Sequence, residues 1–193
     1  ITAIGGSKAD AFVGSQSDLG DNLQGGAGND TFTFASAQLT SIDTVTGGDG
    51  TDILTFSDAA TVVDADFTNF TGVEEINGKA SVALTVTLGA LASAAGITTI
   101  DSVDSVTNTI TLGSDFTNAF TYDMGATAAV TVFDATNYTG ALTVKADLGD
   151  VVIATDTVTG GAGTSDVFKI SGDGGTDDAT AAQVAGVTAF ETW

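Results

Sequence analysis

Short runs of alternating apolar and polar residues dominate the middle of the chain. Val82, Leu84, Val86 and Leu88 alternate with alanine and threonine, which is the period-two pattern of a strand with one buried face. Similar runs recur about every dozen residues, separated by Gly, Asn and Asp. They predict further strands at Ile97–Ile100, Thr109–Leu112, Phe120–Met124, Ala129–Phe133, Leu142–Lys145 and Val151–Ala154. The pattern therefore indicates an all-β fold.

Regular short strands with regular turns are compatible with a sandwich, a barrel or a parallel β-solenoid. Asp43–Leu54 returns at Asp156–Phe168 with one inserted residue, 113 positions further on. We favour the β-solenoid, because a stack of nearly equal rungs needs no long connections and accounts for such a duplication. Threonine and valine suit the pleated strands of its rungs, and glycine and aspartate suit its turns. One short helix is predicted over Leu88–Gly96, ended by Gly96.

The repeated segments divide the chain into three predicted parts. Residues 1–56 hold glycine- and aspartate-rich turns, 57–155 form a β-rich ladder, and 156–193 begin a second unit. Gly72–Ile76 and Ala189–Trp193 follow equivalent turns and carry matched acidic and apolar residues, which we interpret as structural corners rather than ligands. Because the chain begins without Met or a signal peptide, we expect it to be a piece of a larger protein.

The charge balance excludes several kinds of partner. Lys and Arg total 4 against 25 acidic residues, for a net charge of −21, so we expect no binding to nucleic acid and no attraction to anionic lipid. No apolar run reaches the length of a membrane span. The chain has neither His nor Cys, which rules out imidazole-based catalysis and thiolate chemistry. Paired carboxylates can hydrolyse glycosides. The aromatic residues lie mostly at strand positions, where they belong to the core and offer no platform for a sugar, so we expect no enzyme.

One nonapeptide carries the strongest chemical signal. The pattern Gly-Gly-x-Gly-x-Asp-x-U-x, in which U is a large apolar residue, is matched at every position by Gly25–Thr33 and Gly47–Thr55. Gly160–Lys169 matches it with Ser165 inserted, and Gly5–Val13 matches it with Lys8 in place of a glycine. Partial copies place further aspartates one register upstream, at positions 21, 43 and 156.

These residue types suit a calcium site. Glycine permits backbone angles that turn carbonyl oxygens inward, and aspartate adds a carboxylate. Calcium takes six to eight oxygens, more than one turn supplies, so two turns would have to share an ion. We predict that Asp21 pairs with Asp30, Asp43 with Asp52, and Asp156 with Asp166. The predicted ligands are Asp10, Asp21, Gly26, Gly28, Asp30, Asp43, Gly48, Gly50, Asp52, Asp156, Gly161, Gly163 and Asp166.

The alternative is that the same turns only close hairpins and bind no metal. A single turn of this kind favours that interpretation, whereas three copies in register favour calcium. For Asp10, whose turn contains Lys8, the two interpretations stay equally open.

The nonapeptides resemble those of the RTX family, and their spacing by β-rich segments is most similar to its surface-layer branch. The resemblance implies type I secretion, folding on meeting external calcium, and self-association into a lattice on a bacterial cell surface, with surface polysaccharide as a further partner. It also leaves two alternatives open: the extender region of an RTX adhesin, and the calcium-binding tail of a secreted RTX enzyme.

Overall fold

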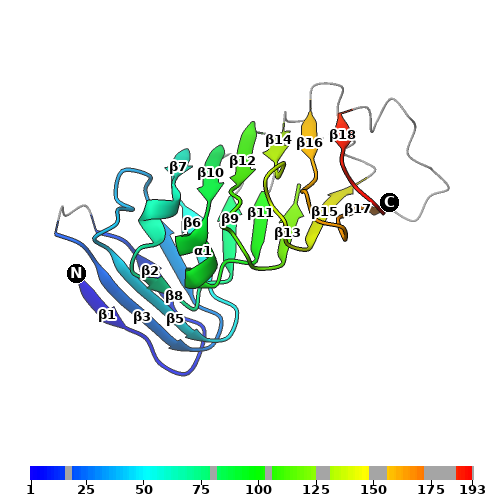
Figure 1. Ribbon diagram of the computed structural model, residues 1–193. Helices are drawn as coiled ribbons and strands as arrows, with labels where there is room; N and C mark the ends of the chain where they lie inside the picture. The colour runs from blue at the N-terminus through cyan, green and yellow to red at the C-terminus, as the bar shows by residue number, and fades with distance from the viewer. Residues whose placement is uncertain are drawn as a thin grey trace.

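The chain folds into a β-solenoid, as the alternation and the duplication predict (Figure 1). The computed structural model describes residues 1–15, 19–78, 82–102, 106–124, 131–147, 156–171 and 186–192. In these segments all strand pairs are parallel. The predicted strand at Val151–Ala154 lies outside the described residues.

One eight-stranded sheet runs through all three predicted parts of the chain. Paired residues in neighbouring strands lie between 20 positions apart (Ala11 with Thr31) and 24 positions apart (Thr143 with Val167), which is the length of one rung. In order along the sheet, its strands are β2 (Ala11–Val13), β4 (Thr31–Phe34), β6 (Ile53–Phe56), β9 (Glu75–Gly78), β11 (Thr99–Ser102), β13 (Phe120–Asp123), β15 (Leu142–Asp147) and β17 (Val167–Ser171).

The facing layer consists of two sheets that follow one another along the solenoid (Figure 1). The first has four strands, in the order β1 (Thr2–Ile4), β3 (Asn22–Ala27), β5 (Thr44–Asp49) and β8 (Phe70–Thr71). The second has six, in the order β7 (Ala60–Val62), β10 (Leu84–Leu88), β12 (Asn108–Leu112), β14 (Thr131–Asp134), β16 (Thr157–Thr159) and β18 (Val187–Thr188). A 3-10 helix, η1 (Asp64–Phe67), joins β7 to β8 at the change of sheet.

The predicted helix is present as α1 (Ala90–Ala95). It packs beside β8 and η1, where the four-stranded sheet ends. Gly96 ends the helix in the left-handed region, at a φ of 110°. The sequence pattern did not reveal that Asp64, from the preceding rung, caps the first turn by accepting the N–H groups of Gly89, Leu91 and Ala92 at 2.8, 3.1 and 2.8 Å.

Apolar side chains form columns between the layers, each built from equivalent positions of successive rungs. In the eight-stranded sheet the inward position is buried in every strand; its members are Phe12, Phe32, Leu54, Ile76, Ile100, Tyr122, Val144 and Phe168. Aromatic neighbours stack in this column, with ring centroids 5.1 Å apart for Phe12 and Phe32. The Phe and Tyr side chains named here are core residues, as the sequence indicates. This repetition along one axis is what stacks the glycine and aspartate turns.

Candidate functional site

The two complete nonapeptides form matching turns at the end of β3 and β5. Gly26, Gly28, Gly48 and Gly50 have φ angles of 108°, 122°, 119° and 140°, values that side chains rarely tolerate. The turns also stack closely, because a Cβ atom on Gly48 would collide with the carbonyl oxygen of Gly26, and one on Gly50 with that of Gly28. Backbone angle and rung spacing each require glycine here.

The first glycine of each motif makes room for the aspartate. A Cβ atom on Gly25 would collide with Oδ2 of Asp30 and lie 2.6 Å from the carbonyl oxygen of Gly47. One rung later, a Cβ atom on Gly47 would likewise collide with Oδ2 of Asp52 and with the carbonyl oxygen of Gly72. A carboxylate oxygen and a carbonyl oxygen thus approach the same glycine in successive rungs.

The motif aspartates form a column along the solenoid, which we call the motif column: Asp10, Asp30, Asp52 and Glu74. Each acidic side chain accepts the backbone N–H of the member before it. The distances are 2.8 Å from Asp10 N to Asp30 Oδ1, 2.7 Å from Asp30 N to Asp52 Oδ1, and 2.8 Å from Asp52 N to Glu74 Oε2. Glu74 therefore extends the aspartate series into a rung that has no nonapeptide.

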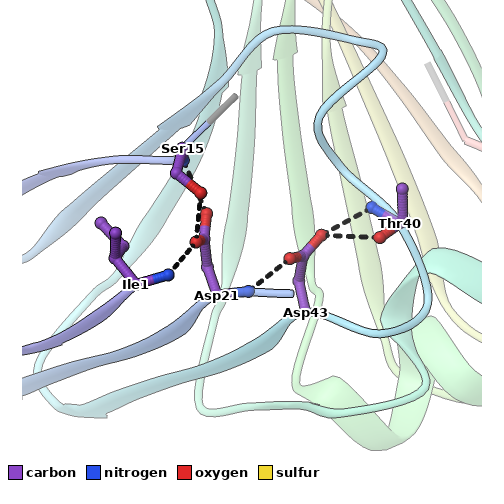
Figure 2. Close-up of polar contacts among 5 residues, drawn as sticks. All are labelled: Ile1, Ser15, Asp21, Thr40 and Asp43. Atoms are coloured by element: carbon purple, nitrogen blue, oxygen red, sulfur yellow. Dashed lines mark hydrogen bonds and ion pairs between the residues drawn. The ribbon is translucent and has the colours of Figure 1, made fainter. Parts of the chain in front are cut away.

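Asp21 and Asp43 belong to a second column, at the start of β3 and β5 (Figure 2). Oδ1 of Asp43 accepts the N–H of Asp21 at 2.7 Å, and Oδ2 accepts the N–H and hydroxyl of Thr40 at 2.8 and 3.0 Å. Asp21 accepts the N–H and hydroxyl of Ser15 at 2.7 and 2.6 Å, and the amino group of Ile1 at 2.6 Å. All four carboxylate oxygens of this pair have partners within the chain.

The later copy of the motif repeats the hydrogen bonds but not the turn. Asp166 donates its N–H to Oε2 of Glu191 at 2.7 Å, as Asp52 does to Glu74. Asp156 accepts the N–H of Thr131 at 2.7 Å. None of the described glycines of this turn has a positive φ, and the turn is one residue longer because it contains Ser165.

The predicted pairing of aspartates across a rung is wrong. Asp21 and Asp30 lie on either side of β3, Asp43 and Asp52 on either side of β5, and Asp156 and Asp166 on either side of β16. At about 3.3 Å per residue, the six-residue β3 and β5 separate their aspartates by far more than two calcium–oxygen bonds. The structure instead brings Asp30 to Asp52 and Asp21 to Asp43, one rung apart. Residues that stack lie one rung apart, which is about 22 positions here, so aspartates that are close in sequence do not meet.

Three carboxylate oxygens of the motif aspartates are buried without a hydrogen-bond partner. They are Oδ2 of Asp30, Oδ2 of Asp52 and Oδ1 of Asp166, and each of these residues is 0% exposed. Burial raises the pKa of Asp52, with the charge of Asp30 adding to it and the N–H of Asp30 opposing it. Burial is also the largest cause that raises the pKa of Asp166. A buried carboxylate oxygen without a donor is costly unless a proton or a cation neutralises it.

The donor set fits a hard cation in chemical type. Carboxylate and carbonyl oxygens are the ligands that calcium prefers, and both kinds meet at Gly25 and Gly47. Among the described residues, no three acidic side chains gather in one place. An ion at the motif column would therefore depend on one or two carboxylates, backbone carbonyl oxygens and water.

The acidic patches around Glu74 and Glu191 are structural corners, as their match in sequence suggested. Glu74 and Glu75 both donate their N–H groups to the carbonyl oxygen of Asp52, and Glu191 and Thr192 donate theirs to that of Asp166, at 3.1–3.2 Å. Sequence reasoning missed Asn108, whose Oδ1 accepts the N–H of Leu84 at 2.9 Å, as Oδ1 of Asp156 accepts the N–H of Thr131 in the same sheet, but without a carboxylate. Asn108 pairs with Thr131 of the next rung, so counting back by one rung length from Thr131 would have found it.

Comparisons with family models, curated proteins and solved structures return no match to this chain. Within the described segments, no helix has the length and apolar character needed to cross a membrane.

Proposed function

We propose that this chain is a structural β-solenoid of a secreted bacterial surface-layer protein of RTX type, held together by calcium and built to associate with copies of itself. The observation that carries the proposal is the set of buried, unpartnered carboxylate oxygens on Asp30, Asp52 and Asp166. They occur in the three turns that match the nonapeptide most closely. The second column, whose oxygens are satisfied within the chain, serves as a metal-free corner.

Calcium would act through folding linkage. The net charge of −21 disfavours a compact calcium-free chain, and each orphaned oxygen costs about 1–3 kcal/mol when left unpaired. A cation that binds only the stacked turns removes both costs. At a hundredfold excess over its dissociation constant, each ion adds about 2.7 kcal/mol to the free energy of unfolding. External calcium would then drive folding after export, because calcium is scarce inside the cell.

The stacked rungs also suit a structural role. The described chain forms one long parallel sheet faced by two shorter ones, and its interior is filled by side chains from both layers. Repeat architectures of this kind extend by adding rungs. The proposal assigns no catalytic residue.

The test is calcium removal followed by far-UV circular dichroism and chemical unfolding. We expect the chain in EDTA to lose most of its β-signal or much of its free energy of unfolding, and to recover both on addition of calcium but not of sodium at equal ionic strength. A chain whose spectrum and stability are the same in EDTA and in calcium would refute the calcium role.

A second candidate, the extender region of an RTX adhesin, is favoured by the duplication itself. Asp52 with Glu74 and Asp166 with Glu191 make the same hydrogen bonds 114 to 117 residues apart, as tandem units would. The two candidates differ in assembly: a surface-layer protein forms two-dimensional arrays on calcium-coated supports in electron micrographs, whereas an extender stays as separate rods.

A further inference from the structure

The outward face of the eight-stranded sheet carries a column of charges in an unusual order. Asp101 pairs in register with Asp123, Asp123 with Lys145, and Lys145 with Lys169. We call this series on β11, β13, β15 and β17 the charge column. Along the solenoid axis it reads acid, acid, base, base. It contains two of the four lysines of a chain whose net charge is −21.

This order is unfavourable for a single molecule. Neighbouring strands lie about 4.8 Å apart, and like charges at directly paired positions destabilise a sheet. Only the central step, from Asp123 to Lys145, joins opposite charges; Nζ and Oδ2 lie 3.8 Å apart there, on half-exposed side chains. The outer steps place acid beside acid and base beside base. An alternating order would have made three favourable contacts instead of one.

The same order is self-complementary. If a second copy faces the first across this surface, turned by 180° about an axis that lies in the plane of the interface, parallel to the strands and between β13 and β15, its column reads base, base, acid, acid against the first. Asp101 then faces Lys169 of the second copy, and Asp123 faces its Lys145. Both unfavourable steps gain opposite charges at once, and the two-fold axis makes the contact isologous.

The neighbouring column allows close approach. Its members at Thr99, Thr121, Thr143 and Val167 are short, uncharged and only partly buried. Lys145 and Lys169 are exposed, and Asp101 and Asp123 are half-buried, so all four can reach across such an interface.

We propose that two copies of this chain associate through the outward face of the eight-stranded sheet, in antiparallel orientation, with the charge column at the centre of the contact. This inference deepens the proposed self-association and rests on it. It does not depend on calcium at the motif column, because the two sites lie at different places on the rung.

The experiment is a charge-swap complementation by analytical ultracentrifugation at low ionic strength in calcium. One variant, K145E/K169E, has an entirely acidic column, and the other, D101K/D123K, has an entirely basic one. We expect each alone to self-associate more than tenfold more weakly than the unmodified chain, because like charges then oppose across the axis. An equimolar mixture should form a heterodimer. Lys8→Glu makes the same charge reversal once, at a distant turn, and should leave dimerisation unchanged.

Circular dichroism of each variant checks that the solenoid is intact and thereby separates this inference from the calcium proposal. If one variant fails to fold, the ionic-strength series of the unmodified chain still decides, since an interface of this kind must weaken as salt rises. A folded chain that stays monomeric at low salt would overturn the inference. So would variants that dimerise as well as the parent, or a mixture that fails to associate.

Discussion

Replacing Asp52 by Asn changes one atom of the motif column and separates its two roles. Oδ1 of Asp52 accepts the N–H of Asp30 at 2.7 Å, and the asparagine carbonyl can keep that bond. The new NH2 group takes the place of the orphaned Oδ2, against Gly47 and near the carbonyl oxygen of Gly72. A buried charge without a donor is thus exchanged for a neutral donor beside an acceptor.

The sign of the effect should depend on calcium. In EDTA we expect Asp52→Asn to raise the free energy of unfolding by about 1–3 kcal/mol, which is the cost of one buried unsatisfied group. In saturating calcium we expect it to lower that free energy by about 2–3 kcal/mol, because the variant loses a ligand and with it the linkage energy of one ion. The measurement is urea unfolding of both proteins in both buffers.

Asp43→Asn is the matched control. Both oxygens of Asp43 accept hydrogen bonds from Asp21 and Thr40, so an NH2 group there replaces an acceptor that is in use. We expect a loss of about 1–2 kcal/mol in either buffer. If Asp52→Asn behaves like this control and responds equally in EDTA and calcium, the metal role of the motif column is refuted.

Three further predictions concern the turns, the pH dependence and the helix cap. Gly48→Ala should cost at least about 2 kcal/mol in thermal unfolding, because its φ of 119° and the carbonyl of Gly26 both oppose a Cβ. Gly6→Ala, two column positions earlier, meets only Asp10 at 3.9 Å and should be tolerated, so equal losses in the two variants would contradict this geometry. In EDTA, the raised pKa of Asp52 and Asp166 means that their folded forms hold protons above the ordinary value of 3.8, so the stability that these two groups contribute should be greatest below that pH and fall as pH rises through the raised values. In calcium the pH dependence of stability should reverse, because acid displaces the ion. Parallel curves of unfolding free energy against pH in EDTA and in calcium would count against the account. Asp64→Ala should lower the free energy of unfolding by about 1–2 kcal/mol through loss of the α1 cap, with Asp64→Asn recovering part of it; an unchanged melting temperature would show that the cap is dispensable.

Much of the fold follows from local pattern. The alternation around Val86 and the glycine at position 96 predict β10 and the end of α1, because each depends on its own neighbours in sequence. The motif glycines could also be predicted, since a positive φ leaves a direct mark on residue type. The change from the four-stranded to the six-stranded sheet at η1 could not, because it depends on how Asp64 meets a helix one rung later.

The pairing of site residues depends on rung length, which local pattern does not reveal. Asp30 and Asp52 share a column because they are separated by the length of one full rung. That length is set by all the strands and turns of the rung together, not by the residues next to either aspartate. Asn108 and Glu74 take corner positions without matching the nonapeptide. Had the 22-residue offset between Asp21 and Asp43 been used as the repeat, both the columns and these substitutes could have been found.

The most direct test of the central claim is an anomalous difference map from crystals grown in calcium and measured at a wavelength where calcium scatters anomalously. The account predicts peaks within bonding distance of Oδ2 of Asp30, Oδ2 of Asp52 and Oδ1 of Asp166, and none beside the satisfied carboxylates of Asp21 and Asp43. A map without peaks at the motif column, with those three oxygens still buried, would contradict it.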